Sequence, residues 1–382
     1  MKTIKIRLLA LMLCAAVCFG CLTAMSGCAS LGESNGTIPT VSQPTEKPDD
    51  TGKPEDEPEP EEIIPLDCNP LTGQKLENGT TDLRPVAVML DNSSAALPHS
   101  GIAAASVVYE MVTEGGIPRL MAVFPSAAAI PGKLGPVRST RDQFVQLLIP
   151  ENMILLHIGC SVYAADMLNA HEYPTVDGIY LGNIIYGFDE VRAATRDNSH
   201  CFYTNNELAA AGIAYKEIAA KGSVDTLFRF VPYDKPVREC ELPASTVEFS
   251  FSMSVPVSFV YNTETARYAK TEYGLPQMDE ATGEQASYTN LLLLGCPVGL
   301  KSDELCTDFD FTGGGEGYYF THGSCEKVQW KKGDVEDPLT LYTADGKQEL
   351  AVNTGTSYVA FIDNRALEGT LLVDTVSPYK AE

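Results

Sequence analysis

The segment VVYEMVTEGGIPRLMAVF, residues 107–124, decides the fold of this chain. Its two apolar runs, 106–112 and 120–124, predict strands, and the Gly115-Gly116 pair between them predicts the turn that joins them. Two motifs of this region, TEGGIPRL at 113–120 and GPVRSTRD at 135–142, carry two carboxylates and three arginines. Because a simple core would not use so many charges, the same region also predicts a site.

The chain around this hairpin alternates strand and helix patterns. Apolar runs at 84–90 and 153–158 predict further strands, and 136–148, 161–169 and 205–220 have helical spacing. Alternation of this kind indicates an α/β domain, which we place at residues 68–232.

After about residue 230 the helical periodicity nearly disappears. Strand-like runs follow at 246–251, 256–261, 288–294, 317–330 and 358–362, with a glycine turn at 313–317. The sequence therefore predicts an α/β N-terminal domain followed by a smaller, mainly β C-terminal domain, residues 233–382.

The N-terminus has the pattern of a secretory signal, residues 1–27. Basic residues come first, an apolar run follows at 8–23, and the segment ends Met25-Ser26-Gly27-Cys28. This ending is similar to the lipobox of bacterial lipoproteins, in which cleavage leaves the cysteine to be acylated. We expect acylated Cys28 to hold the protein in the lipid bilayer, on the extracytoplasmic face of the cell membrane. The alternative, an uncleaved transmembrane anchor, would need a longer apolar run.

Residues 28–67 are expected to form an acidic, Pro- and Thr-rich disordered tether. From residue 31 to residue 67 there are eleven acids and two lysines, with almost no large apolar side chains before Ile63. Such a segment cannot bury enough surface to offset its ordering entropy. The whole chain carries a formal net charge of −24, which argues against nucleic acid as a partner and against direct adsorption to anionic lipid.

Seven cysteines follow Cys28, and they are sparse and widely spaced. Their odd number leaves at least one thiol unpaired, and a Cys296–Cys306 bridge and free buried thiols both stay open. The chain has no CxxC motif and its five histidines show no metal spacing, so we expect no metal site. No glycine fingerprint of a nucleotide site occurs either, and we expect no cofactor.

Several motifs, in order, resemble those of the YerB-type lipoproteins, which carry a domain of unknown function numbered 3048. They are RPVAVMLDN at 84–92, PHSGI at 98–102, VVYEMVTE at 107–114, GPVRSTRD at 135–142, and His200 with Tyr203-Thr204. The resemblance runs from about residue 69 to the C-terminus and includes the family's second domain. It implies the lipid tether and a two-domain fold, and it implies no established reaction. The chain departs from the family pattern at 159–162 and 199–204.

The GPVRSTRD motif predicts an anion receptor at a helix start. Pro136 suits the first turn of a helix, which would place Arg138, Arg141 and Asp142 on one face, with Ser139 beside them. Free backbone amides and two guanidiniums suit phosphate or carboxylate. The alternative is that both arginines pair with acids of the preceding strand and only fix the helix to the sheet.

Two carboxylates of the central hairpin belong to the same expected site. Glu110 lies inside an apolar strand, where a carboxylate must be paired or protonated. In a regular strand Glu110 and Glu114 would lie about 13 Å apart, too far for a simple glycosidase pair. We expect Arg119 to return towards Glu114 across the hairpin. A structural ion-pair network and a catalytic role both stay open.

Further polar residues follow strands and are expected in one crevice. Asn92 follows the strand at 84–90, and Ser161 follows the strand at 153–158. If the two strands are parallel neighbours, their ends would meet the Arg138 segment, because ligands of open α/β sheets bind at the carboxyl ends of strands. His200 lies in a loop that we expect to reach the same place.

Two classes of function follow from these residues. The first is a non-enzymatic envelope lipoprotein, in which the α/β crevice binds an anionic cell-envelope or small-molecule ligand and the β domain binds a protein partner. The second is a cell-envelope hydrolase or transferase that acts on a phosphate- or carboxylate-bearing wall precursor, with Glu114 or His200 transferring a proton. We favour binding, because the sequence has no nucleophile–base pair of recognised spacing.

Overall fold

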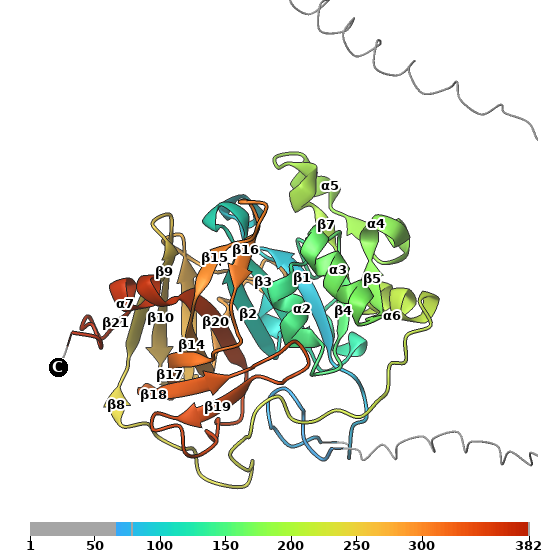
Figure 1. Cartoon of the computed structure of the whole chain (residues 1–382). Coiled ribbons are helices and arrows are strands. Elements are labelled where there is room, and N and C mark those ends of the chain that lie inside the picture. The colour runs from blue at the N-terminus through green and yellow to red at the C-terminus, as the bar shows by residue number, and fades with distance from the viewer. Residues whose placement is uncertain (1–65, 78, 381–382) are drawn as a thin grey trace, which may run out of the picture. The chain divides into compact units, whose positions relative to one another are not determined.

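The computed structural model describes residues 66–77 and 79–380 (Figure 1). The expected signal peptide, Cys28 and nearly all of the tether lie outside these residues. Within the described part of the chain, no helix has the length and apolar character that crossing a membrane requires.

One large mixed sheet runs through the described residues. Its strand order is β19-β18-β17-β14-β20-β2-β3-β1-β4-β5, and β8 pairs with β18. The bounds are β1 (Val86–Asp91), β2 (Val107–Val112), β3 (Pro118–Phe124), β4 (Ile154–His157), β5 (Thr175–Asp177), β8 (Leu242–Pro243), β14 (Asn290–Cys296), β17 (Gly315–Thr321), β18 (Ser324–Lys331), β19 (Thr340–Thr343) and β20 (Ser357–Asp363). Because β2 pairs in parallel with β20, the two halves of the chain share this sheet.

A smaller sheet packs on one face of the large sheet. Its order is β12-β11-β10-β9-β21, with β13 paired to β11. The bounds are β9 (Thr246–Ser252), β10 (Val255–Asn262), β11 (Arg267–Glu272), β12 (Leu275–Pro276), β13 (Ser287–Tyr288) and β21 (Leu372–Val373). Phe259 of the small sheet meets Tyr358 of the large one with ring centroids 4.9 Å apart, inside one continuous apolar core.

Short helices cover parts of the large sheet. They are α2 (Asp142–Leu148), α3 (Val162–Ala170), α4 (Gly178–Leu181), α5 (Glu190–Ala193), α6 (Asn206–Tyr215) and α7 (Asn364–Thr370). Helices α2 and α3 lie side by side in front of β1 and β4 (Figure 1). A second apolar core lies on the face of the large sheet opposite the small sheet, and there Phe144 and Val145 of α2 pack with Met89 and Leu155. Every residue of β1 is buried, which explains its unbroken apolar run.

Single-turn 3₁₀ helices and two small ribbons complete the described elements. The 3₁₀ turns are η1 (Ser94–Ala96), η2 (Ile102–Ala104), η3 (Glu114–Gly116), η4 (Ala127–Ala129), η5 (Gly182–Ile184) and η6 (Asn198–His200). The ribbons pair β6 (Gly187–Phe188) with β7 (Phe202–Tyr203), and β15 (Val298–Leu300) with β16 (Thr307–Phe309).

The fold agrees with the expected classes in part. The C-terminal half is mainly β, as predicted, whereas the N-terminal half has a mixed sheet and few helices, so the α/β description holds only loosely. The boundary between residues 232 and 233 stays a prediction. The Gly115-Gly116 turn is confirmed, with φ of +71° at both glycines, a conformation that glycine adopts without strain.

One predicted helix start is wrong. Residues 136–141 are extended, and α2 begins only at Asp142, with Arg141 as its N-cap at φ −132° and ψ 156°. The reason is tertiary pairing: the Arg138 amide donates to the Met89 carbonyl at 2.9 Å, and the Ile158 amide donates to the Arg138 carbonyl at 3.1 Å. The segment therefore lies between the ends of β1 and β4, and these hydrogen bonds replace those of a helix.

The described cysteines are all free thiols. Cys296 and Cys306, for which a bridge was one alternative, are buried and unbridged. Burial raises the pKa of both thiols to about 12, so neither forms a reactive thiolate at neutral pH.

Candidate functional site

The carboxyl edge of the large sheet collects most of the predicted site residues. β1, β2 and β4 run in the same direction, since β1 pairs in parallel with β4 and both β1 and β2 pair antiparallel with β3. Asp91 ends β1, Glu114 follows β2, and Arg119 is the second residue of β3, opposite Asp91. The strands expected to be parallel neighbours, β1 and β4, are therefore confirmed as such.

Asp91 is the buried anion of this edge. It is 1% exposed, its Oδ2 lies 2.8 Å from His200 Nδ1 and 3.1 Å from Arg138 Nε, and its Oδ1 accepts from the Ser93 amide at 3.0 Å. Burial alone would raise the pKa of Asp91, but the Ser93 amide and the guanidiniums of Arg138 and Arg119 outweigh burial and lower the pKa. Asp91 is thus ionised, and it holds His200 and Arg138 together.

Glu114 and Arg141 form a bidentate ion pair beside this group. Arg141 Nε donates to Oε1 at 2.6 Å and Nη2 donates to Oε2 at 2.8 Å. Burial raises the pKa of Glu114, but the bonds to Arg141 lower it by more, so the net pKa is below its usual value. Since both oxygens accept from Arg141, this carboxylate is poorly placed to transfer a proton.

Arg119 is the least compensated cation of the edge. Its Nη1 donates to the Ser139 carbonyl at 2.7 Å, while its buried Nε has no hydrogen-bond partner among the described residues. Burial, followed by repulsion from Arg141, lowers the pKa of Arg119 to about 10, and Arg138 adds to this repulsion. The expected ion pair between Arg119 and Glu114 does not form within the described chain; Arg119 braces the 135–141 segment instead.

Three other predicted ligand residues make structural contacts. Asp142 pairs with Lys301 at 2.8 Å, Ser139 Oγ donates to the Ile158 carbonyl at 2.8 Å, and Ser161 Oγ caps α3 by accepting from the Ala164 amide at 3.2 Å. These bonds hold the segments around the arginines in position.

Asn92 and Glu110 lie elsewhere, in a cluster sealed from solvent. Lys270 Nζ lies 2.5 Å from Glu110 Oε2 and 2.8 Å from Glu272 Oε2, and all three side chains are 0% exposed. Asn92 Nδ2 donates to Glu110 at 2.7 Å, and the Tyr358 hydroxyl donates to Glu110 Oε2 at 2.7 Å. Asn92 and Glu110 therefore lie in this enclosed cluster and not in an open crevice, which corrects their expected placement.

Sequence reasoning missed Lys270 and Glu272, which come from β11 in the other half of the chain. Burial, followed by the charge of Glu110, raises the pKa of Glu272 to about 8. One signal was present: in RYAKTE, residues 267–272, Lys270 and Glu272 are two positions apart, as is Tyr268 from Lys270, so in a strand these three share one face, which is the buried one.

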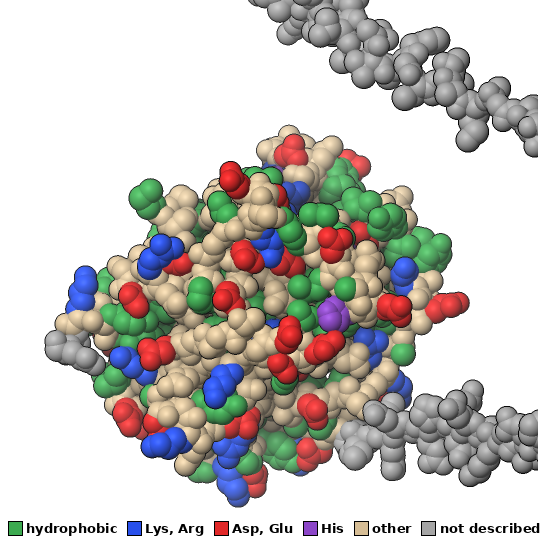
Figure 2. Space-filling model, in the orientation of Figure 1, with side chains coloured by type: hydrophobic (Ala, Val, Ile, Leu, Met, Phe, Trp, Pro, Cys, Tyr) green, Lys and Arg blue, Asp and Glu red, His purple; other side chains and the backbone are tan. Residues whose placement is uncertain are grey.

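Arg119, Arg138 and Arg141 lie at this carboxyl edge of the large sheet, which we call the arginine edge. Acidic side chains are spread over the face seen in Figure 2, and basic side chains are scattered among them.

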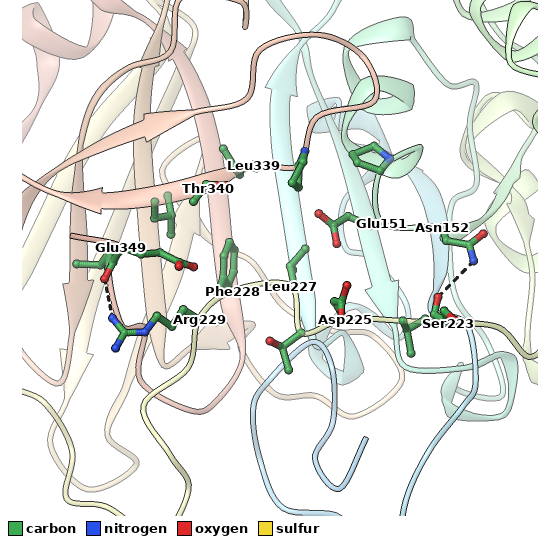
Figure 3. A pocket seen from close by; sticks show the side chains of 16 residues that line it. Glu151, Asn152, Ser223, Asp225, Leu227, Phe228, Arg229, Leu339, Thr340 and Glu349 are labelled. Atoms are coloured by element: carbon green, nitrogen blue, oxygen red, sulfur yellow. Dashed lines mark hydrogen bonds between the residues drawn. The ribbon is translucent and has the colours of Figure 1, made fainter. Parts of the chain in front are cut away.

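A separate hollow of about 270 Å³ lies between residues 223–229 and β19, with Glu151 and Asp225 on one side and Arg229 on the other (Figure 3). None of the predicted site residues lines it.

Two domain families match the chain in consecutive segments. The family described as "Protein of unknown function (DUF3048) N-terminal domain" matches residues 71–219, and its C-terminal domain matches residues 246–359. The chain belongs to this family. The YerB-type membership that the motifs of the chain predicted is therefore confirmed.

YerB of Bacillus subtilis is similar to this chain in both sequence and structure. "Putative lipoprotein YerB" of strain 168 is 28% identical over 266 residues, which cover 69% of this chain and 77% of the relative. The crystal structure of the YerB protein matches with a TM-score of 0.68 at 24% identity, and the match covers 78% of this chain and 98% of that one. The structural likeness shows that the two chains share a fold.

Proposed function

We propose that this protein is a lipid-anchored envelope lipoprotein that binds an anionic ligand at the carboxyl edge of the large sheet. One observation carries the proposal: Arg119, Arg138 and Arg141 converge there, and among the described residues only Asp91 and Glu114 form ion pairs with them. In a chain with a formal charge of −24, such a cluster of guanidiniums suits phosphate or carboxylate.

The accessibility of the arginines supports the same reading. The Arg138 side chain is 32% exposed, whereas Arg119 is 6% exposed with its Nε unpaired. The backbone around Arg138 is held by hydrogen bonds to both β1 and β4. A ligand would therefore meet positioned guanidiniums, which reduces the ordering cost of binding.

The cellular location rests on the N-terminal pattern and on the relative. The Met-Ser-Gly-Cys ending at Cys28 is similar to a lipobox, and the curated relative is described as a lipoprotein. Acylated Cys28 would anchor the protein to the extracytoplasmic face of the membrane, and the acidic tether would hold the folded part away from the lipid.

Titration calorimetry with inorganic phosphate tests the binding proposal. We expect Arg138→Ala to weaken phosphate binding at least tenfold and Arg138→Ala with Arg141→Ala to abolish it. Arg365→Ala is the matched control, because among the described residues this exposed guanidinium pairs only with Asp363. Phosphate affinity that is unchanged by Arg138→Ala, or absent in the wild type, would remove the proposal.

A second candidate function, an envelope hydrolase or transferase, is favoured by the His200–Asp91 pair. Asp91 accepts from Nδ1, which leaves His200 Nε2 without a hydrogen bond among the described residues and able to act as a base. With p-nitrophenyl phosphate as the probe, His200→Gln should remove hydrolysis while inorganic phosphate still binds. Hydrolysis that persists in His200→Gln would exclude this histidine as the base.

A further inference from the structure

We propose that a hollow at the ends of β4 and β5 binds a hexose-type sugar ring, next to the arginines. The inference rests on the proposed function, since the same ligand would carry its anionic group to Arg138. The ligand class is therefore a sugar that bears a phosphate or a carboxylate.

The hollow has the size and place of a ligand site. Its volume is about 320 Å³, and it lies where two parallel strands end, a preferred place for ligands in open sheets. Its polar lining comes from five elements or their flanks: His157, Cys160, Asn169, Asp177, Tyr180 and Lys216.

His157 presents an unused hydrogen-bond acceptor at this hollow. Its Nδ1 lies 2.8 Å from the Gly159 carbonyl, which can only accept, so Nδ1 carries the proton. Burial lowers the pKa of His157, which keeps the ring neutral and leaves a lone pair on Nε2. The residue is 1% exposed and its Nε2 has no partner in the described chain. Buried polar atoms of this kind are normally satisfied, so a ligand donor is the missing partner.

Asp177 adds a second acceptor. Its Oδ1 accepts from the amides of Gly159 at 2.8 Å and Ile179 at 3.0 Å, and its Oδ2 accepts no hydrogen bond from the described residues. An imidazole lone pair and a carboxylate oxygen together favour a ligand that donates from several hydroxyl groups. Because Asp177 would repel a free anion, this hollow favours an uncharged group that carries hydroxyls, whereas the arginine edge favours an anion.

The rim supplies the complementary groups. Tyr180 is 85% exposed, and Asn169 and Lys216 are exposed with no side-chain hydrogen bond or ion pair to the other described residues. An amide and an ammonium donate to the hydroxyl oxygens of a sugar. An exposed tyrosine ring offers a flat apolar face for the C–H face of the same ring.

One segment connects the hollow to the arginines. The Thr140 amide donates to the Gly159 carbonyl at 3.0 Å, and the Ser161 amide donates to the Thr140 carbonyl at 3.2 Å. Burial raises the pKa of the Cys160 thiol, and the nearby positive charge of Arg141 opposes this rise. Thr140, which lies between Arg138 and Arg141, is therefore hydrogen-bonded to the segment that carries Cys160 of the hollow's lining.

Calorimetry with glucose 1-phosphate, glucuronate, methyl glucoside and inorganic phosphate tests the inference. We expect glucose 1-phosphate to bind at least tenfold more tightly than phosphate, and Tyr180→Ala to remove this advantage without changing the affinity for phosphate. Tyr215→Ala, which removes another exposed tyrosine outside the hollow, should leave both affinities unchanged. Glucose 1-phosphate and glucuronate distinguish the two sources of the anionic group.

The outcomes separate this inference from the proposed function. Phosphate binding that depends on Arg138, with no gain from the sugar or a gain that survives Tyr180→Ala, overturns the sugar site and keeps the anion site. Binding of methyl glucoside that depends on Tyr180, without any phosphate binding, supports the sugar site and overturns the anion site. Absence of binding by all four probes overturns both.

Discussion

Two clusters of charged side chains contain neighbouring residues of the chain, Asp91 and Asn92, but differ in their exposure to solvent. Asp91 at the end of β1 belongs to the arginine edge, where Arg138 is one-third exposed, while the next residue, Asn92, belongs to the Lys270 cluster, where every charge is 0% exposed. The pleat of a strand sends successive side chains to opposite faces, so one residue step separates the two clusters.

The difference lies in how completely the charges are paired. In the buried cluster Lys270 contacts both carboxylates, and Tyr358 and Asn92 supply further hydrogen bonds. These groups join β2 to β11 and β20, so they brace the two halves of the chain. At the edge Arg138 pairs with Asp91 and Arg141 pairs with Glu114, whereas Arg119 Nε has no partner among the described residues and Arg138 is partly exposed, which leaves capacity for a ligand. Charged groups that are all paired with one another stabilise the fold, whereas a guanidinium group without a full set of partners can still bind a ligand.

Removal of Lys270 should have the largest effect on stability. Lys270→Met leaves Glu110 and Glu272 buried without their cation, and we expect the free energy of unfolding to fall by about 3–5 kcal/mol. Urea denaturation measures this change in the free energy of unfolding, and Lys347→Met, at an exposed lysine, is the control. A loss below about 1 kcal/mol would show that the buried cluster does not need its cation.

Glu272 should make stability fall as pH rises. Its pKa is raised from 4.5 to about 8 in the folded state, so the native protein holds a proton that the unfolded chain releases. The stabilisation is complete below about pH 4.5 and is lost as pH rises towards 8, with a slope of at most about 1.4 kcal/mol per pH unit. Glu272→Gln should flatten the curve of unfolding free energy over this window. An identical curve in the variant would assign the slope to other groups.

Breaking the Arg141–Glu114 pair should have an intermediate effect. The Glu114 side chain is 24% exposed, so water partly replaces the lost partner. We expect Arg141→Ala to lower the free energy of unfolding by about 1–2 kcal/mol, as charged hydrogen bonds allow. Glu114→Gln should cost a similar amount if the pair, rather than either residue alone, is what stabilises the edge.

The smallest effect on stability is expected at Arg138. An ion pair with this much exposure contributes less than about 1 kcal/mol, so Arg138→Ala should shift the melting temperature by only a few degrees. The variant should nevertheless lose phosphate affinity. A large loss of stability would instead make Arg138 a structural residue and remove the contrast between the two clusters.

Local patterns predicted the elements that depend on nearby residues. The apolar run of 107–112, the Gly115-Gly116 turn and the apolar run of β4 all appear where expected, because each is decided by backbone freedom and by burial of its own side chains. The position of the Arg138 segment at the ends of β1 and β4 was also foreseen, since parallel neighbours end at the same edge.

The helix expected to begin at Pro136 shows where such reasoning stops. Proline followed by helical spacing is a local signal, but residues 138–140 form hydrogen bonds with β1 and with the segment after β4. Those partners are distant in the chain, so no window of sequence could contain them. Lys270 was missed for the same reason, because it meets Glu110 across 160 residues.

By itself, the sequence determined the family, the lipobox-like N-terminus and the strands of the central hairpin, since these depend on residue type and short-range order. Only the tertiary structure decided which charges are sealed and which face solvent. It placed Glu110 with Lys270, because the small sheet packs over this face of the large sheet, and it left Arg138 partly exposed beyond the end of β1. Burial is a property of the whole fold, and burial decides whether a charge braces the structure or can meet a ligand.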